Sequence, residues 1–438
     1  LFSADIPKDR LVIDFVGNVR GYLEPCGCHS GQYGGVARRA TYLSRLKQSY
    51  PHPVTVFNGD MGINSNSQEK VKTEYLFEAF DKMGYDAMNM GENEFTFGWD
   101  FVKGLQSRYN NLISANIYNK ESGKLLFNPY LIKSVPVIIA GETVMVKVGI
   151  VGVMDPTYES IVRSVQGGPS LEVSDPVEAL NKYIPEMRKD GAVMVVVLGH
   201  IGMQDSLDML KKVKDVDLWV AGHEPFQYVE NPKKVGKTIV VLNGDRGRWT
   251  GYAAYQMKNR KQSVFLKTQE TTLNEGIPDD VSMSGLVMSY KKGLTLPVPP
   301  KNTISIFSWN KRPSFAGAQS CLQCHPRMYF AWRKTAHSKA LVSLKQKHSD
   351  QRVECVVCHT VGYGKGGYVN EKQTPRLAGV QCESCHGSGL RHVAAAYGQH
   401  KNTIFRPKGP ETCLTCHDKE HDPKFVYVDK KLKIKHWH

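Results

Sequence analysis

Residues 192–198 read Ala-Val-Met-Val-Val-Val-Leu (AVMVVVL), an uninterrupted valine-rich run of the kind that is buried on both faces in a sheet. Similar short apolar runs recur from residue 11 to about residue 257, and amphipathic stretches with helical spacing lie between several of them. We expect strands at residues 11–16, 54–57, 144–153, 192–198, 218–221 and 238–242, and helices at 36–47, 71–83, 176–189 and 206–213. This alternation predicts an α/β layered domain.

The length of the chain and a proline-rich stretch predict two domains. At 438 residues the chain is too long for one ordinary hydrophobic core. A last helical pattern at 281–291 is followed by LTLPVPPKN at 294–302, whose prolines favour an extended, semi-rigid path. We therefore place a linker at 292–312, between a domain at 1–291 and a domain at 313–438. The second domain lacks strand signals and apolar residues, so we expect it to be small, mainly helical and irregular.

The second domain carries four copies of Cys-x-x-Cys-His. They are Cys321-Leu-Gln-Cys324-His325, Cys355-Val-Val-Cys358-His359, Cys382-Glu-Ser-Cys385-His386 and Cys413-Leu-Thr-Cys416-His417. In c-type cytochromes two such thiols attach one haem, and the adjacent histidine is the proximal ligand of its iron. Zinc ribbons also use paired cysteines, but they do not require a histidine directly after every pair. The pattern predicts four covalently attached c-type haems, which implies assembly outside the cytoplasm.

The sixth ligands of these irons must come from other histidines. His337 lies on an expected helix at 330–340, and His392 follows the third motif closely, so we predict both as distal ligands. His436 is a third candidate. The remaining places are open to the histidines outside the motifs, and one iron could be five-coordinate or take a histidine from a neighbouring molecule. These competing histidines are His348, His400, His421 and His438.

Charge and hydropathy exclude two classes of protein. The net charge is +15, and residues 313–438 hold 20 Lys and Arg against 9 Asp and Glu, so the basic excess belongs to the second domain. Haem propionates would offset most of it, and there is no basic helix or RNA-binding motif, so we expect no nucleic-acid partner. No apolar run is long enough for a membrane helix. The chain begins at Leu1 rather than Met, from which we expect that an export signal has been removed.

Four runs in the second domain, WRKTAH (332–337), CVVCHTVGY (355–363), GVQCESCHGSGLRHV (379–393) and CLTCHDKEHDPKF (413–425), resemble the nitrifier-type tetrahaem cytochrome c family. The resemblance covers residues 320–438. It implies closely packed haems that serve electron transfer, with His337 and His392 at the family's distal positions. Related tetrahaem modules also occur in polymeric extracellular cytochrome filaments, which makes self-assembly a further expectation.

The first domain, over residues 10–253, looks like the metallophosphoesterase domain of the 5′-nucleotidase group, which includes the thiol esterases of thiosulfate oxidation. The resemblance implies a four-layer α/β sandwich with two metals at the carboxyl ends of strands. Gly59-Asp60 retains the bridging aspartate, and His200 and His223 match two further ligands. The family's Gly-Asn-His-Glu is Gly91-Glu92-Asn93-Glu94 here, so Glu92 replaces an asparagine ligand.

Other positions of that metal site are lost. The family's Asp-x-His is Asn18-Val19-Arg20 here, and arginine cannot ligate a metal because it is permanently protonated. The histidine that would assist the leaving group is Asn93, and the last histidine ligand is Pro225. The clamp of two metals on the attacking and leaving oxygens is therefore lost, and we expect a domain retained mainly as a scaffold.

Asp60, Glu92, His200 and His223 could still hold a single divalent ion in an oxygen and nitrogen shell. Three interpretations remain open for this site. The domain could be catalytically inactive, it could keep some activity with one metal, or the metal could serve structure alone.

Two other features near the expected cleft have more than one interpretation. In Cys26-Gly27-Cys28-His29 the two thiols could form a disulfide, which we favour outside the cytoplasm, bind a soft metal with His29, or stay free. His29 could also reach a haem of a neighbouring subunit. The arginines of the loop 243–248 (NGDRGR) could bind an anion or simply be solvated in a turn.

We expect an exported electron carrier, periplasmic or at the cell surface. Its partners would be redox proteins, an extracellular electron acceptor or further copies of itself. The alternative is a redox-coupled, metal-dependent hydrolase or a sulfur-compound converting enzyme that uses the Asp60 cluster. Electron transfer is favoured over hydrolysis because the haem motifs are complete and the metal site is not.

Overall fold

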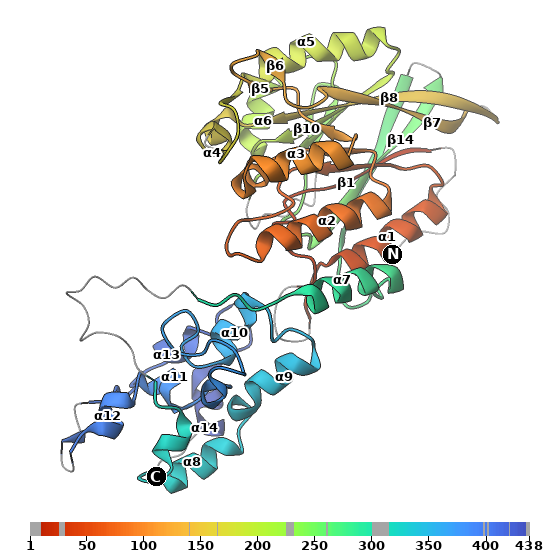
Figure 1. The fold of residues 1–438 in the computed structure, drawn as a ribbon. Coiled ribbons are helices and arrows are strands. Elements are labelled where there is room, and N and C mark those ends of the chain that lie inside the picture. The colour runs from red at the N-terminus through yellow and green to blue at the C-terminus, as the bar shows by residue number, and fades with distance from the viewer. Residues whose placement is uncertain are drawn as a thin grey trace. The chain divides into compact units, whose positions relative to one another are not determined.

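The computed structural model describes residues 10–25, 31–139, 141–163, 165–224, 232–259, 262–299, 315–396, 399–400, 403–419 and 421–434. The chain divides into two compact units, with the boundary between Val287 and Met288. The first unit holds the strands and the second is made of short helices (Figure 1). In the described ranges no helix has both the length and the apolar character that crossing a membrane requires.

Two six-stranded sheets form the first unit. The first sheet has the order β15-β14-β1-β2-β3-β4, and the second has the order β12-β13-β11-β10-β8-β7. In the first sheet β1 to β4 are parallel, and antiparallel pairing with β14 and β15 lies at one edge. In the second sheet the four central strands are parallel, and an antiparallel strand lies at each edge. The strands of the first sheet are β1 (Arg10–Val16), β2 (Val54–Asn58), β3 (Ala87–Asn89), β4 (Leu112–Ile113), β14 (Trp249–Asn259) and β15 (Gln262–Thr272). Those of the second are β7 (Tyr130–Ile139), β8 (Glu142–Met154), β10 (Met194–His200), β11 (Leu218–Ala221), β12 (Lys233–Val235) and β13 (Thr238–Leu242). A small third sheet has the order β6 (Lys124–Leu125), β5 (Ile117–Asn119), β9 (Leu171–Val173).

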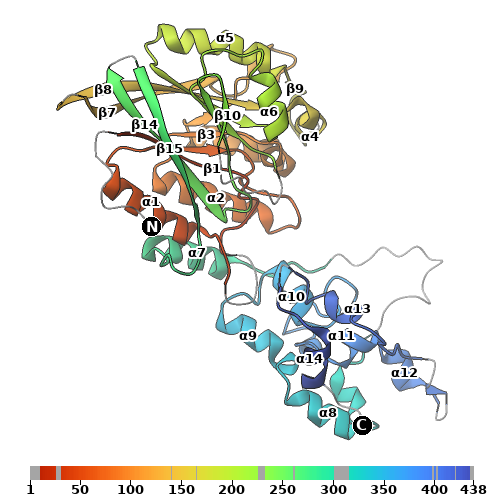
Figure 2. The ribbon, with the colours of Figure 1, turned by 180° about the vertical axis from the view of Figure 1, so that it is seen from behind.

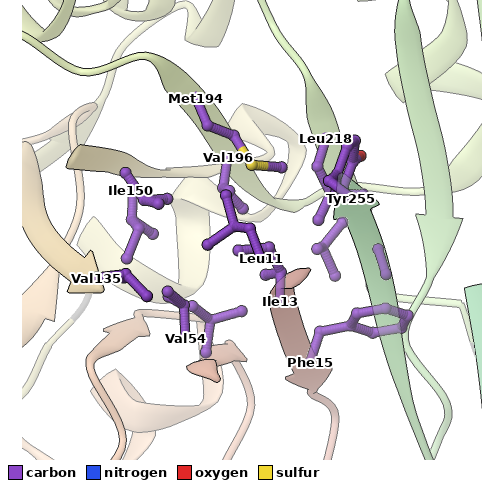
Figure 3. Packing of buried hydrophobic residues seen from close by; sticks show 14 of the residues in the cluster. Leu11, Ile13, Phe15, Val54, Val135, Ile150, Met194, Val196, Leu218 and Tyr255 are labelled. Carbon is purple, nitrogen blue, oxygen red and sulfur yellow. The ribbon is translucent and has the colours of Figure 1, made fainter. Parts of the chain in front are cut away.

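The two large sheets face each other across one apolar core. Leu11, Ile13 and Val54 of the first sheet pack against Ile150 and Val196 of the second, and all five are fully buried (Figure 3). A second apolar cluster joins the outer face of the second sheet to helix α5 (Pro176–Lys189). Helices α1 (Val36–Ser49) and α2 (Glu69–Met83) cover the outer face of the first sheet, as both views of the ribbon show (Figures 1 and 2). The layers are therefore α/β/β/α, and the predicted four-layer sandwich is confirmed.

Local sequence explains where several elements begin and end. The strands predicted at 218–221 and 238–242 and the helix predicted at 176–189 are confirmed at the predicted bounds. Helix α5 begins where Asp175 accepts a hydrogen bond from the amide of Val177 at 2.7 Å, with Pro176 at the first helical position. Helix α2 ends at Gly84, whose φ of 77° suits glycine. The other helices of this unit are α3 (Trp99–Arg108), α4 (Glu159–Arg163), α6 (Met203–Met209) and α7 (Val281–Gly293), which crosses the boundary between the units.

The second unit consists of short helices joined by irregular segments (Figure 2). Its apolar cluster is small and centres on Leu341, Val356, Val361 and Leu377. No strand is found in its described residues beyond an isolated bridge between Thr360 and Ala378. Its helices are α8 (Pro326–Arg333), α9 (Ala340–Gln346), α10 (Val353–His359), α11 (Cys382–His386), α12 (Leu390–Ala394), α13 (Glu411–Leu414) and α14 (Tyr427–Lys433). The expectation of a small, mainly helical and irregular domain is confirmed.

Two predicted helices are wrong in their bounds. The helix predicted at 330–340 is broken: α8 ends at Arg333, and His337 begins the 3-10 helix His337–Lys339. The hydroxyls of Thr335 and Ser338 donate to the carbonyls of Trp332 and Arg333, and such bonds compete with the helical ladder.

The helix predicted at 206–213 runs from Met203 to Met209 instead. It begins early because the Glu224 carboxylate, far along the chain, accepts from the Met203 amide at 3.0 Å.

Residues 294–299 of the predicted linker contact the second unit. The amide of Leu296 donates to Gln351, and the hydroxyl of Tyr363 donates to the carbonyl of Pro297. Residues 300–312 lie outside the described ranges.

Candidate functional site

The strand ends of the first unit bring four predicted metal ligands together. Asp60 follows β2, Glu92 follows β3, His200 ends β10 and His223 follows β11, so both sheets contribute from the carboxyl ends of parallel strands. Ligand atoms of all four residues lie within 4.8 Å of one another. Asp60 and His200 are fully buried, and Glu92 is nearly so. This cluster is a possible metal site with a mixed carboxylate and imidazole shell.

Glu92 contacts both histidines of this cluster. Its Oε2 lies 3.1 Å from His200 Nε2, and its Oε1 lies 2.9 Å from His223 Nε2. His200 Nδ1 lies 3.0 Å from the carbonyl oxygen of Asn58, so Nδ1 is the protonated nitrogen that donates there and Nε2 faces the carboxylates. A ring held in this way presents Nε2 to a metal, so the donor set fits one divalent ion.

Burial and charge shift the pKa values inside the cluster. Burial favours neutral His200, but the carboxylates of Asp60 and Glu92 outweigh it and raise the pKa of His200 to about 9. Burial likewise opposes ionisation of Glu92, yet hydrogen bonds from His200 and His223 hold its pKa well below the usual range. In the metal-free cluster the His200 imidazole and Glu92 are therefore stabilised as oppositely charged partners.

The backbone around the cluster is held in the sparsely populated left-handed region. Asn18, Arg20, Asp60, His223 and Arg246 all have φ between 50° and 60°. A Cβ atom on Gly59 would lie 2.4 Å from His200 Nδ1, and one on Gly91 would lie 2.4 Å from Asp60 Oδ1, so only glycine fits at these two approaches. Strained conformations of this kind persist where the surrounding structure enforces them, and they gather at functional sites.

Residues that replace the family's lost ligands contact Asp60. The side-chain amide of Asn93 donates to Asp60 Oδ2 at 2.7 Å, and Arg20 Nε lies 3.6 Å from the same oxygen. An asparagine side chain cannot deliver a proton to a leaving group. Pro225 and the Cys26-Gly27-Cys28-His29 segment lie outside the described residues.

The arginines of the loop 243–248 are close to neighbouring side chains. The guanidinium of Arg246 lies 5.3 Å from the ring centroid of Tyr22, and its Nε lies 3.5 Å from Asp245 Oδ2. The guanidinium of Arg248 lies 6.0 Å from the same ring. Anion binding by this loop stays a prediction.

In the second unit, local turns fold each described motif so that its histidine lies near its cysteines. Two motifs occupy α10 and α11. In the first motif the amide of His325 donates to the carbonyl of Cys321, and in the fourth the amide of His417 donates to that of Cys413. These i to i+4 turns bring the imidazole to the same side as the thiols.

Hydrogen bonds orient three of the four proximal imidazoles. The Nδ1 atom of His359 lies 2.9 Å from the carbonyl oxygen of Ala340, that of His386 lies 3.0 Å from that of Phe405, and that of His417 lies 2.9 Å from Asp422 Oδ2. Engaging Nδ1 leaves Nε2 for a metal and fixes the plane of the ring. The residues present therefore fit covalently bound haem.

Two pairs of imidazoles face each other at a spacing suited to an iron. The ring centroids of His325 and His392 lie 6.2 Å apart, and those of His337 and His417 lie 6.1 Å apart. These centroid distances are larger than those of two rings joined by a direct hydrogen bond. They leave room between the rings for an iron with a metal–nitrogen bond of about 2 Å to each ring. The structure thus places His392 beside the first motif and His337 beside the fourth.

The other histidines predicted as competitors have varied surroundings. His400 Nδ1 lies 2.9 Å from the carbonyl oxygen of His392, and His421 Nδ1 lies 2.8 Å from Asp418. His348 sits at a turn with φ of 51°. His436 and His438 lie outside the described residues, so the candidacy of His436 stays a prediction.

Comparisons with known proteins agree with these two sites. A model of the family cytochrome c554 and c-prime matches residues 320–387. Cytochrome c-554 of Nitrosomonas europaea is 42% identical over 116 residues, which are 22% of this chain and 48% of that protein. The snake venom 5′-nucleotidase of Gloydius brevicauda is 31% identical over 307 residues, which are 64% of this chain and 51% of that protein. The chain therefore spans about half the length of these curated relatives.

A solved structure shows the same fold for the first unit. The calcineurin-like phosphoesterase YfkN of Bacillus subtilis has a TM-score of 0.57 at 20% identity, covering 65% of this chain and 98% of that one. The N-terminal region matches the 5′-nucleotidase and metallophosphoesterase family, and the helical C-terminal region matches a cytochrome c554 domain. We call them the phosphoesterase-like unit and the cytochrome unit. Both resemblances predicted from the sequence are confirmed.

Two buried carboxylates have structural roles that sequence reasoning missed. In the phosphoesterase-like unit Glu94 is fully buried and accepts from the amides of Met61 at 2.6 Å and Gly91 at 2.9 Å, which ties together the loops after β2 and β3. Burial, and next the charge of Asp60, raises the pKa of Glu94 to about 8. Its place at the end of Gly91-Glu92-Asn93-Glu94 was visible, but the partner amide lies 33 residues away.

In the cytochrome unit the missed residue is Glu383, inside the third motif. Its carboxylate is 3% exposed and accepts from the amides of Ala316, Gly317 and Gly389 at 2.6 to 2.9 Å. The only sequence signal was a charged residue in a Cys-x-x-Cys spacer. Glu383 fastens the segment before the first motif to the third motif.

Proposed function

We propose that this chain is a multihaem electron carrier that works outside the cytoplasm and uses its phosphoesterase-like unit as a scaffold. The observation that carries the proposal is the set of oriented imidazoles in the cytochrome unit. Three motif histidines engage Nδ1 with an acceptor, and two histidines from elsewhere lie opposite motif histidines at about 6 Å. Such pairing belongs to a site that keeps both axial positions filled, which suits electron transfer rather than substrate binding.

A c-type haem, when bound, supplies an iron that gains and loses one electron. In this proposal His325 with His392 would hold one such iron, and His417 with His337 would hold another. The thiol of Cys321 contacts that of Cys382, and the thiol of Cys416 contacts that of Cys358. Thiols of the first and third motifs, and of the second and fourth, are therefore neighbours. Neighbouring attachment points support short distances between redox centres.

Haem counting and spectroscopy test this proposal. We expect the mass of the purified chain to show four haems, and low-temperature electron paramagnetic resonance to show at least two low-spin irons with two imidazole ligands. Replacing His392 or His337 with Met should change one low-spin signal each, while His52→Met, at an exposed position of the phosphoesterase-like unit, serves as the control. Fewer than four haems, or signals unchanged in both variants, would contradict the assignment.

Export and self-assembly are parts of the same proposal. Attachment of c-type haem supports a location in the periplasm or at the cell surface. The apolar side chains of Val428 and Leu432 on α14 are 70% and 67% exposed, which supports contact with another protein or another copy of the chain. Cryo-electron microscopy of the native extracellular fraction should show filaments if the chain polymerises. Single particles alone would leave the carrier as a discrete protein with redox partners.

A second candidate function is a metal-dependent hydrolase or sulfur-compound converting enzyme coupled to the haems. The buried cluster of Asp60, Glu92, His200 and His223 favours it, because its four donors and strained backbone remain in place. The contact of Asn93 with Asp60 favours the inactive scaffold instead. Turnover of nucleotide or thiol esters with added Mn²⁺, abolished by Asp60→Asn, would establish the enzyme. A full haem complement with no such turnover would leave the scaffold.

A further inference from the structure

Arg20 lies between two buried carboxylates in the phosphoesterase-like unit. Its Nε atom is 3.6 Å from Asp60 Oδ2 and 3.8 Å from Asp245 Oδ1. The side chains of Asp60 and Asp245 are 0% and 1% exposed, and that of Arg20 is 19% exposed. Buried carboxylates are costly unless a positive charge lies close by. The guanidinium is such a charge, because arginine carries a permanent positive charge in proteins.

Asp60 faces the possible metal site and Arg20 at once. Its Oδ1 is 3.5 Å from His200 Nε2 and 3.3 Å from the amide of Asn93, and its Oδ2 faces Arg20. Asp60 thus contributes one oxygen to the four-ligand cluster and, together with Asp245, borders a second region of negative potential. The guanidinium of Arg20 lies in this second region.

The backbone of the loop after β1 is constrained to deliver Arg20 to this place. Arg20 has φ of 50°, and its amide donates to the carbonyl of Asp60 at 3.0 Å. Asn18 has φ of 51°, donates to the carbonyl of Gly59 and accepts from the amide of Arg246. The Asn18 side-chain amide is fully buried, and neither of its polar atoms has a hydrogen-bond partner within the described part of the chain. An orphaned buried amide in this loop is typical of a place built for a polar occupant.

We propose that Arg20 is a built-in cation that fills the position between Asp60 and Asp245, so that the cluster holds one divalent ion and is closed to a second. The charges support this arrangement. Among the buried carboxylates of this region, Glu94 accepts from the amides of Met61 and Gly91. The three that face the cluster or Arg20, of Asp60, Glu92 and Asp245, are balanced by one divalent ion and one guanidinium while the histidines are neutral ligands. Arg246, 3.5 Å from Asp245, adds a further positive charge on the far side and makes a second divalent ion still less favourable. The inference goes beyond the electron-carrier proposal and does not depend on the haem assignments.

The test measures Mn²⁺ bound per chain and the melting temperature of the haem-loaded, full-length protein. The wild type should bind one Mn²⁺ at saturation. Arg20→Met should bind two, and its metal-free form should melt below the wild type and gain more from Mn²⁺. Arg20→Lys, which keeps the charge, should bind one. Arg38→Met is the matched control, because Arg38 is also mostly buried and lies 3.5 Å from Asp279, away from the cluster.

Compensation separates a charge effect from simple misfolding. The double variant Arg20→Met/Asp245→Asn removes the carboxylate that Arg20 balances, so it should return to one Mn²⁺ and recover most of the melting temperature. If Arg20→Met does not fold, recovery of folding in the double variant supports the proposal and failure to recover overturns it. Equal Mn²⁺ binding in Arg20→Met, Arg20→Lys and the wild type, with unchanged melting, also overturns it. Haem content measured on the same samples reports on the carrier proposal separately.

Discussion

The two units of this chain differ in what fills their interiors. The phosphoesterase-like unit closes two sheets over an apolar core that includes Leu11, Ile150 and Val196, all fully buried. The cytochrome unit has a small cluster around Val356 and Leu377, and it exposes large apolar side chains such as Phe330, Val357 and Phe405. The first interior is made by side chains. The second leaves apolar side chains exposed, which covalently bound cofactors would cover.

This difference explains why the two sites have changed to such different extents. A fold held by its own core can lose metal ligands and keep its shape, and Arg20 and Asn93 stand where the family resemblance leads us to expect histidines. A fold whose cofactors complete the core cannot lose attachment residues without losing structure, and all four Cys-x-x-Cys-His motifs are intact. The loss of ligands in one unit and their retention in the other follow from the same physics.

The largest expected effect comes from removing one haem attachment point. In Cys355→Ser/Cys358→Ser the second motif can no longer bind its haem covalently, and Cys355 packs against the small apolar cluster. We expect the cytochrome unit to become sensitive to protease while residues 31–287 stay resistant. Limited proteolysis with mass spectrometry measures this. Equal resistance of both units would show that the cytochrome unit has a sufficient core without that haem.

The corresponding change in the phosphoesterase-like unit creates a cavity between its two large sheets. Ile150→Ala should destabilise the phosphoesterase-like unit by about 2–5 kcal/mol, because Ile150 is fully buried in the core of Figure 3. Urea unfolding followed by circular dichroism measures the cost, and the haem spectrum should not change. Val264→Ala on β15 is the control, since Val264 is 44% exposed and its truncation should cost at most about 0.5 kcal/mol. A haem shift in Ile150→Ala would contradict independent interiors.

Sequence pattern predicted the elements whose signal is local. The strands at 218–221 and 238–242 are uninterrupted apolar runs, and helix α5 carries its own cap in Asp175 and Pro176. The pattern failed where a distant residue decides a boundary. Glu224 starts α6 early, and short hydroxyl bonds break the helix before His337. Both effects depend on contacts that periodicity does not contain.

The candidate sites show the same contrast between local sequence signals and contacts of distant residues. Asp60, His200 and His223 match positions of the family's motifs, Glu92 replaces an asparagine of one motif, and the structure brings the four residues together. The pairing of His325 with His392 and of His337 with His417 could not be predicted, because each pair is separated by more than sixty residues. Arg20 was named as a loss, and only its distances to Asp60 and Asp245 give it a role.

The metal-free cluster should make stability depend on pH. Burial favours the neutral ring, but Asp60 and Glu92 raise the pKa of His200 to about 9, above its usual 6.5. The folded state therefore binds this proton more tightly than the unfolded state. The stabilisation is complete below pH 6.5 and is lost as pH rises to about 9, by up to ~3 kcal/mol. The lowered pKa of Glu92 acts only at acidic pH, outside this window.

Urea unfolding of the chelator-treated protein between pH 6.5 and 9 measures this loss. His200→Gln should reduce the slope and leave the part that Glu94 contributes up to about pH 8, because the pKa of Glu94 is also raised, and His52→Gln, at an exposed position, should leave the slope unchanged. Saturating Mn²⁺ should reverse the slope, because a metal competes with the proton for Nε2 and binds better as pH rises. A profile identical in wild type and His200→Gln would show that the cluster is not charged in the folded, metal-free state.

The smallest expected effect concerns how much the polypeptide, apart from its haems, stabilises the cytochrome unit. Glu383 is one of the few buried carboxylates there, and it holds three backbone amides from segments on either side of the third motif. Glu383→Ala should leave these donors unpaired and cost at least about 1–3 kcal/mol. Glu383→Gln should cost less because one acceptor remains. Glu411→Ala, an exposed glutamate beside the fourth motif, is the control.

Thermal unfolding followed at the haem absorbance measures these variants. If the haems alone stabilise the unit, Glu383→Ala will melt at the same temperature as Glu411→Ala, and the hydrogen bonds of Glu383 are dispensable. If Glu383→Ala melts earlier with its haems still attached, the polypeptide contributes order of its own through a buried charge. That outcome makes the cytochrome unit a fold in which covalent cofactors fill the interior and one carboxylate fixes how the first and third motifs lie together.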